Sequence, residues 1–199
     1  MEAFRKLTSL FLAALLTLSA LAVVPLTASA EVAVPTEETR NGVTAYYIDS
    51  ADEFIALAKD IGMGTGNHAA YYSKTFIITT DLDMSGKTWP QAITFRGTLD
   101  GQGHTIKNLN LTSSGMFNNV SATFKNFAIV DCTVNAAHPA VIARDALASS
   151  TTTFENVYIG GTINAASGSL YAGTFIARMH DTGANHLIFK NCVSDVTIT

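Results

Sequence analysis

A four-residue pattern recurs along this chain of 199 residues: an apolar residue, any residue, an asparagine and a second apolar residue. Its asparagines lie 18, 30 and 35 residues apart, at Asn108, Asn126, Asn156 and Asn191. Asparagine tolerates the left-handed backbone conformation that a sharp bend requires. Constant short strands with irregularly spaced bends are typical of a parallel β-helix, whose turns stack about 4.8 Å apart while extra residues loop out.

In such a fold the four asparagines form one structural row, each side-chain amide bonding to the next. The pattern also predicts an internal stack of aromatic rings from Phe124, Phe154 and Phe189. The residues between ring and asparagine then point outward, and their charges alternate in sign along the stack, which favours stacking. These outward residues are Lys125, Glu155 and Lys190.

Composition agrees with a mainly β fold and excludes several classes of protein. Thr, Ile and Val, which favour strands, number 25, 14 and 12. A hydrophobic content of 48% with 14% charged residues argues against intrinsic disorder. The net charge of -4 and the absence of a basic run argue against nucleic acid as a partner. The two cysteines are too few for a disulfide-rich scaffold, and both are expected in the core.

The first thirty residues have the pattern of a secretory signal peptide. Arg5 and Lys6 precede an apolar run from 7 to 24, and Ala28-Ser29-Ala30 follows as a cleavage site. The alternative is an uncleaved anchor, because the run approaches the roughly 20 residues that span a bilayer. We expect cleavage, no membrane span in the mature chain, and a protein that is secreted or held at the cell surface.

The remaining chain divides into three expected parts. Residues 31–43 are polar and predict a loose leader, and residues 44–74 predict a strand followed by an amphipathic helix. Ser50 and Glu53 fit a capping box at the start of that helix. One apolar stripe follows at helical spacing, which suits a cap over the exposed end of a sheet; it consists of Phe54, Leu57, Ala58 and Ile61. Residues 75–199 form the β-helix repeats.

The stretch from Asp81 to Leu109 resembles the opening of bacterial surface proteins with GLUG-type repeats. The resemblance rests on Asp81-Leu-Asp-Met-Ser-Gly86, on Trp89-Pro90, and on the run Phe95-Arg-Gly-Thr-Leu-Asp-Gly-Gln-Gly-His-Thr-Ile106-Lys-Asn-Leu109. The GLUG tetrapeptide itself is degraded, to Gly115-Met-Phe117 and Gly173-Thr-Phe-Ile176. The resemblance implies a right-handed parallel β-helix of the pectin-lyase-like class, on a large secreted or wall-attached protein without an assigned enzyme activity.

Two arginines are the main candidates for ligand binding. Arg144 and Arg178 end the similar segments Val141–Arg144 and Phe175–Arg178, which are 34 residues apart. If they stack, an anion must lie between two like charges, and a carboxylated sugar is a suitable one because arginine binds carboxylates in a bidentate way. Alternatively Asp145 and Asp181 neutralise both arginines internally.

Two aspartates are the candidates for a metal site. Asp81 and Asp83 are two residues apart and face the same side of a strand, as Ca²⁺ ligands would. An aspartate before Ser-Gly is also an ordinary way to end a strand, and we expect no other cofactor. Asp100 and His104 flank a Gly-Gln-Gly turn, and the turn explains them better than acid–base chemistry does.

Two function hypotheses follow. The first is a non-catalytic, adhesin-like surface module that binds a polysaccharide or a cell-surface glycan. The second is a lyase or hydrolase acting on an acidic polysaccharide, which needs either two carboxylates flanking the bond or a base with Ca²⁺. No such catalytic set is evident, so the first hypothesis is favoured.

The last residues, 191–199, still belong to a repeat. Repeat arrays need a polar terminal cap, and an uncovered strand edge invites pairing. We therefore expect either further domains after residue 199 or end-to-end self-association.

Overall fold

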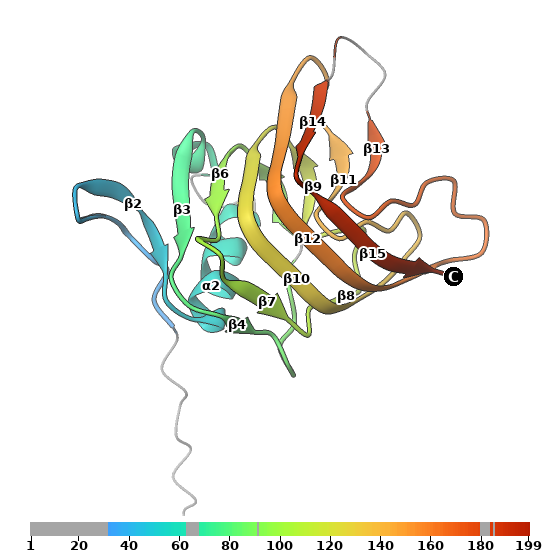
Figure 1. Ribbon diagram of the computed structural model, residues 1–199, viewed down its shortest axis with the longest axis horizontal. Coiled ribbons are helices and arrows are strands. Elements are labelled where there is room, and N and C mark those ends of the chain that lie inside the picture. The colour runs from blue at the N-terminus through green and yellow to red at the C-terminus, as the bar shows by residue number, and fades with distance from the viewer. Residues whose placement is uncertain (1–31, 63–67, 91, 180–183, 185) are drawn as a thin grey trace, which may run out of the picture. The chain divides into compact units, whose positions relative to one another are not determined.

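A computed structural model describes residues 32–62, 68–90, 92–179, 184 and 186–199, which are mainly β (Figure 1). The expected signal peptide, residues 1–30, lies outside these ranges. One α-helix, α2 (Ala51–Gly62), and one 3₁₀ helix, η1 (His68–Tyr71), precede most of the strands within them. The described strands are β1 (Glu37–Arg40), β2 (Val43–Ile48), β3 (Lys74–Ile78), β4 (Leu82–Asp83), β5 (Ala92–Phe95), β6 (Gly97–Asp100), β7 (Thr105–Lys107), β8 (Asn110–Leu111), β9 (Phe117–Val120), β10 (Thr123–Ala136), β11 (Ala143–Ala146), β12 (Thr151–Ala165), β13 (Ile176–Met179), β14 (His186–Lys190) and β15 (Val193–Ile198).

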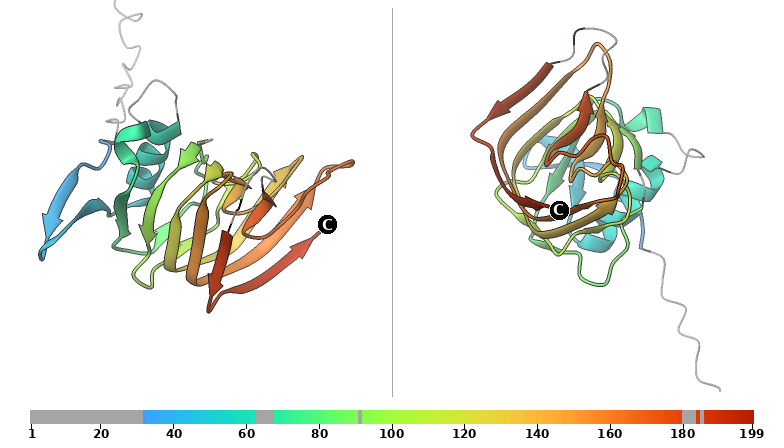
Figure 2. Two further views of the ribbon diagram at one scale, coloured as in Figure 1. Left: turned by 90° about the horizontal axis from the view of Figure 1, so that it is seen from above. Right: turned by 90° about the vertical axis from the view of Figure 1, so that its right-hand side faces the viewer.

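The strands form a curled eleven-stranded sheet and a separate four-stranded sheet. The main path of the large sheet is β1-β2-β3-β6-β10-β12-β14, and the small sheet has the order β13-β11-β9-β5. Among the described residues, β1 and β2 pair antiparallel and every other pairing is parallel. The chain passes repeatedly from the large sheet to the small one, as β6–β8 to β9, β10 to β11 and β12 to β13 (Figure 2). We call each such passage a circuit.

As the chain crosses the large sheet, it bends at two positions before it passes to the small sheet. The first bend contains Asn126 in β10, Asn156 in β12 and Asn191 between β14 and β15, with φ of 58°, 54° and 51°. The second bend contains Asn108 between β7 and β8, and Asp131 in β10, with φ of 57° and 54°. Asn and Asp have short polar side chains that can hydrogen-bond locally, so they adopt the left-handed conformation at a lower energetic cost than most residues.

Asn108 therefore does not belong to the row in which the sequence pattern placed it. Ile106 and Lys107 pair with Ile129 and Val130, which lie after the first bend of β10. The same four-residue pattern thus serves at two different bends, because the register with the neighbouring strand decides which bend a segment occupies.

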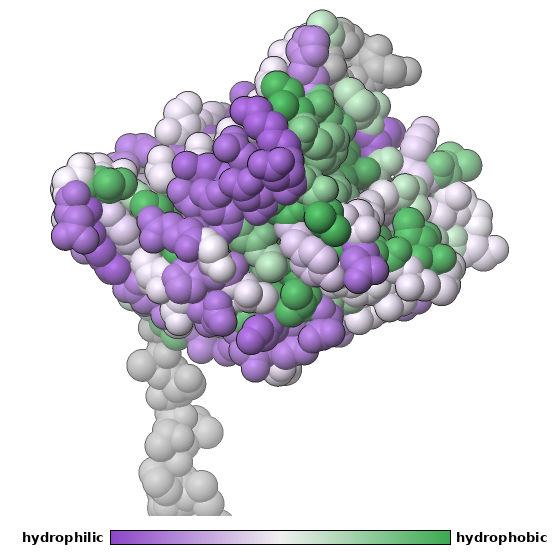
Figure 3. Space-filling model, viewed as in Figure 1, coloured by the Kyte–Doolittle hydropathy of each residue, from purple (hydrophilic) through white to green (hydrophobic). Residues whose placement is uncertain are grey.

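The core between the sheets is a column of large apolar side chains. Phe76, Leu99, Phe124, Phe154 and Phe189 occupy matching positions in successive strands. The rings of Phe124 and Phe154 stack at 5.3 Å and those of Phe154 and Phe189 at 5.1 Å, which confirms the predicted aromatic stack. Phe124 and Phe154 are fully buried, whereas Phe189 is 49% exposed. Figure 3 shows apolar residues gathered over β14, where this column reaches the surface.

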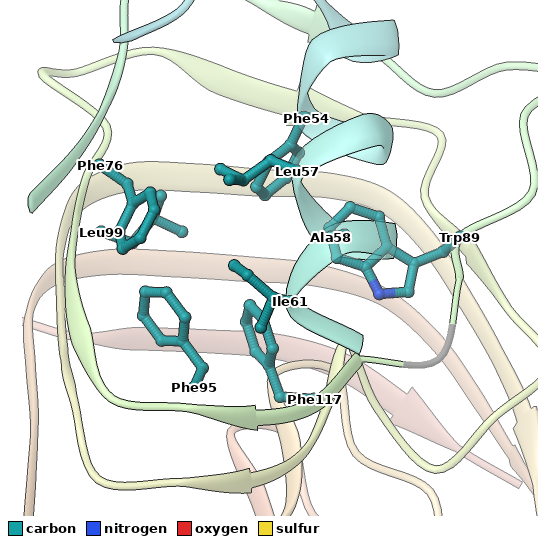
Figure 4. Close-up of a pocket in the computed structure, with 9 residues that line it drawn as sticks. All are labelled: Phe54, Leu57, Ala58, Ile61, Phe76, Trp89, Phe95, Leu99 and Phe117. Atoms are coloured by element: carbon teal, nitrogen blue, oxygen red, sulfur yellow. The ribbon is translucent and has the colours of Figure 1, made fainter. Parts of the chain in front are cut away.

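Helix α2 covers the core at the N-terminal end of the large sheet, as the apolar stripe predicts. The Ser50 hydroxyl accepts the Glu53 amide at 3.2 Å, and the Glu53 carboxylate accepts the Asp49 amide, one residue earlier than a standard capping box. Figure 4 shows Phe54, Leu57 and Ile61 facing the core. The void among the nine side chains there is about 10 Å³, at the lower limit for one water molecule, so this is packed core.

Residues 31–43 are not a loose leader throughout, because they include β1. Asn41 and Gly42, with φ of 51° and 80°, connect β1 to β2 as a tight hairpin. Arg40 reinforces it by donating to both carboxylate oxygens of Asp49, at 3.0 and 2.8 Å. The expected leader therefore provides the edge strand that covers β2.

Both cysteines are free thiols. Cys132 is buried in the core, and burial raises the pKa of its thiol to about 11. Cys192 directly follows Asn191 and is only partly buried.

Candidate functional site

The small sheet brings Arg144, Asp145 and Arg178 together. Asp145 on β11 pairs with Arg178 on β13, 33 residues later. One of its carboxylate oxygens accepts the Arg178 Nε–H at 2.7 Å, and the other accepts Arg178 Nη2–H at 2.9 Å. The second oxygen also accepts the Arg144 Nε–H at 2.8 Å. We call these three residues the arginine cluster.

The two arginines do not stack on one another as their equivalent sequence positions suggest. The sequence alignment pairs residues 34 apart, whereas the strands pair residues 33 apart, so Arg178 lies opposite Asp145. The anion between the two like charges is thus a carboxylate of the chain itself. The second predicted partner, Asp181, lies outside the described residues.

The cluster is buried at its carboxylate and open at its guanidinium groups. The side chain of Asp145 is 1% exposed and those of both arginines are 36% exposed. Burial alone would raise the pKa of Asp145, but the hydrogen bonds from Arg178 and Arg144 outweigh it and hold that pKa below its ordinary value. Asp145 is therefore an ionised anchor, and two positive groups against one negative group leave a net charge of +1.

An aromatic side chain flanks the cluster. The guanidinium carbon of Arg178 lies 5.4 Å from the centroid of the Tyr171 ring, within cation–π range. The Tyr171 ring also meets the His138 ring in an edge-type contact, with centroids 5.6 Å apart. Tyr171 and its neighbour Leu170 are exposed, so an aromatic ring open to solvent lies beside the Arg178 guanidinium.

Asp81 and Asp83 serve as hydrogen-bond acceptors between neighbouring strands. Asp81 Oδ1 accepts the Thr105 amide at 2.9 Å and lies 3.4 Å from His104 Nδ1. Asp83 Oδ1 accepts the Ser85 amide at 2.9 Å, and it also accepts the Asn108 Nδ2–H at 2.9 Å.

The bonds from Asn108 and Ser85 lower the pKa of Asp83 to about 2. In the described part of the chain, no three His, Cys, Asp or Glu side chains form a group that could hold a metal ion. The Ca²⁺ site at Asp81 and Asp83 stays a prediction.

Three of the four predicted row asparagines lie together at the first bend. Asn156 Nδ2–H donates to Asn126 Oδ1 at 2.9 Å, and Asn191 Nδ2–H donates to Asn156 Oδ1 at 3.2 Å. Asn126 in turn donates to Asp100 at 3.1 Å. We call Asn126, Asn156 and Asn191 the amide row.

An open groove of about 430 Å³ follows the amide row. Residues just past the first bend also line it, among them Ala128, Tyr158 and Val193. The sequence pattern gave the row but not the groove. The sequence signal for the groove is the repeat itself: aligning the bends at Asn126, Asn156 and Asn191 places positions 128, 158 and 193 side by side.

No family model matches this chain, and no curated protein matches it. The fold is similar to the crystal structure of a protein from Bacteroides ovatus named "putative immunoglobulin A1 protease", with a TM-score of 0.54 and 19% identity. The match covers 77% of this chain and 48% of that protein, so the chain spans about half its length. At this identity the similarity establishes a shared fold.

Among the described residues, no helix is long and apolar enough to cross a membrane.

Proposed function

We propose that this chain is a non-catalytic module of a secreted or surface-attached bacterial protein and that it binds carboxylated glycans. We propose further that its fold is a right-handed parallel β-helix of the GLUG type. The parallel circuits and stacked bends support the β-helix, and right-handed crossovers are the rule for parallel strands. The signal-peptide pattern of residues 1–30 supports export. The Bacteroides ovatus protein, whose name implies an antibody substrate, is consistent with an extracytoplasmic setting.

The observation that carries the binding proposal is the unequal use of the two guanidinium groups in the arginine cluster. Arg178 donates to Asp145 with two nitrogens, whereas Arg144 donates only its Nε–H. Both terminal nitrogens of Arg144 are without a hydrogen-bond partner among the described residues, and its side chain is 36% exposed. An arginine fixed at Nε and open at its outer edge can bind a ligand carboxylate in a bidentate way.

A binding role fits the cluster better than catalysis does. Both oxygens of Asp145 accept guanidinium hydrogens, and its pKa is lowered, so it is a poor proton donor at neutral pH. A hydrolase needs a second carboxylate across the bond, and the cluster itself supplies only this one.

Calorimetric titration of the chain with a hexagalacturonate tests the proposal. Arg144→Gln should weaken binding by about tenfold or more, because hydrogen bonds to charged groups contribute roughly 1.5–3 kcal/mol. Binding should also weaken with added salt. Arg96→Gln is the matched control, since Arg96 is exposed, lies over the Tyr72 ring at 4.9 Å and is not part of the arginine cluster, so its loss should leave binding unchanged.

Equal affinity of wild type and Arg144→Gln would contradict the proposal. The appearance of an unsaturated sugar chromophore during the titration would instead establish the lyase alternative.

A further inference from the structure

The amide row presents a repeated set of hydrogen-bonding groups to solvent. Asn156 uses one of its two N–H groups on Asn126 and one of the two Oδ1 lone pairs on Asn191. Its second N–H and second lone pair remain for another partner, and the residue is exposed. Because adjacent strands are about 4.8 Å apart, the row offers this pair of groups at that interval along the groove.

The rest of the groove lining is partly apolar. Ala128, Tyr158 and Val193 pair with one another across β10, β12 and β15. Val193 is 53% exposed. The Tyr158 hydroxyl donates to Asp195 at 3.2 Å, which anchors the ring at its polar end. An anchored tyrosine ring beside a row of amides offers an apolar surface and polar groups at once.

Two lysines beside the amide row form ion pairs. On the strand segments before the first bend, Lys125 lies 3.0 Å from Asp100 and Lys190 lies 3.6 Å from Glu155. Figure 3 shows hydrophilic residues gathered over β6 and β10, the strands that contain Asp100 and Lys125. The groove lining itself consists of Asn, Gly and apolar or aromatic residues. A charged ligand gains little in such a groove.

We propose that this groove binds an uncharged polysaccharide, laid along the amide row. A neutral sugar chain matches the groove because its hydroxyl groups donate and accept hydrogen bonds at regular intervals, and its ring carbons present an apolar face to Tyr158. The site is distinct from the arginine cluster in residues, in sheet and in ligand charge, and it does not depend on that cluster binding anything.

Binding of cellohexaose and mannohexaose, followed by ¹⁵N chemical shifts, tests this proposal. At least one of the two sugars should shift the side-chain NH₂ signals of Asn126, Asn156 and Asn191. Tyr158→Ala should weaken that binding by about tenfold, because the ring contact is lost. Tyr158→Phe keeps the ring and removes only the bond to Asp195, so its affinity should stay within about twofold.

Arg144→Gln is the control that separates the two sites. It should leave the binding of the neutral sugars unchanged, whatever its effect on hexagalacturonate. Absence of side-chain amide shifts with both sugars at millimolar concentration would overturn the proposal. Wild-type affinity in Tyr158→Ala would overturn it as well. So would side-chain amide shifts that appear only with hexagalacturonate, or only with an extended peptide.

Discussion

The first and second bends of the large sheet change the chain direction by the same backbone means but differ in their residues. At the first bend asparagine repeats in three successive circuits, and each side chain bonds to the next. At the second bend the residue changes from Asn108 to Asp131, and in β12 the matching segment contains Gly161. The left-handed conformation alone tolerates several residue types. Repetition of asparagine therefore reflects side-chain bonding as well as backbone shape.

The second bend also shows how a neighbouring backbone can restrict which residue type a position allows. Gly161 has φ of 150°, and a Cβ built on it would lie 2.2 Å from the carbonyl oxygen and 2.7 Å from the amide nitrogen of Cys132. Both contacts are to backbone atoms, which cannot move aside as the end of a side chain can. Close approach of the Cys132 backbone therefore requires glycine at position 161. At position 108 the asparagine side chain instead has a hydrogen-bond partner, Asp83.

The largest expected effect is that of Gly161→Ala. The added methyl group must displace the β10 backbone and adopt an unfavourable φ, so we expect a loss of about 3 kcal/mol in the free energy of unfolding. Urea denaturation measures it. Gly168→Ala is the control, because Gly168 has φ of 83° with open space around it and should lose only about 1 kcal/mol. Equal losses would mean that strain, and not close approach, dominates at Gly161.

Asn156→Ala should destabilise the chain by about 2 kcal/mol, roughly half from the left-handed backbone and half from the amide bonds. Asn156→Gly removes the amide but accepts the backbone conformation, so it should lose only about 1 kcal/mol. The same denaturation measurement separates the two contributions at the first bend. If the two variants are equally stable, the backbone conformation contributes nothing and the amide bonds account for the whole loss at the first bend.

Asn156→Ala should also cost more than Asn108→Ala. Asn156 bonds to neighbours on both sides, at about 1 kcal/mol for each bond. Asn108 donates one bond, to Asp83, and the exposure of that carboxylate to solvent keeps the bond near the same value of about 1 kcal/mol. Thermal melting of the two variants gives the order. Matching melting shifts would indicate that the amide row adds no stability beyond that of a single bond.

Asn108→Gly should raise the pKa of Asp83 from about 2 toward its ordinary value of 3.8, since the bond from Asn108 is the main cause of the shift. A carboxyl ¹³C titration followed by NMR reads this directly. Asp100, at the start of the first bend, should keep its own lowered pKa in this variant, because it accepts from Asn126 and not from Asn108. A shift at Asp100 would show that the bends are coupled.

The smallest effect is the pH dependence contributed by these aspartates. The folded pKa values of Asp83 and Asp100 lie below 3.8, so their contribution to stability is complete above about pH 4. It is lost as the pH falls through the folded values, which for Asp83 means near 2. Unfolding measured from about pH 6 down to 2 should show this decline, and Asp83→Asn should remove the part at lowest pH.

Much of the fold could be predicted because its signals are local. The apolar stripe and Ser50 predicted α2, and the asparagines predicted where Asn126, Asn156 and Asn191 bend the chain. The β1–β2 hairpin also has a local signal, since Asn41-Gly42 is a strong hairpin signal within an otherwise polar segment.

The remaining features depend on register, which a single sequence does not contain. Asn108 has the same local pattern as Asn126, yet pairing of Lys107 with Val130 assigns it to the other bend. The sequence predicts that Arg144 and Arg178 stack, but a difference of one residue in strand pairing places Asp145 opposite Arg178. The groove beside the amide row arises from three strands distant in sequence, so it follows only from aligning the repeated bends and not from any one segment.

The position of Cys192 gives this protein a built-in attachment point for a reporter. Thiol reagents react with the thiolate, and Cys132 is both buried and raised in pKa to about 11. A maleimide dye at neutral pH should therefore modify Cys192 selectively. The dye would then be attached directly after the last asparagine of the amide row, where its emission would report on a neighbouring sugar without any engineered residue.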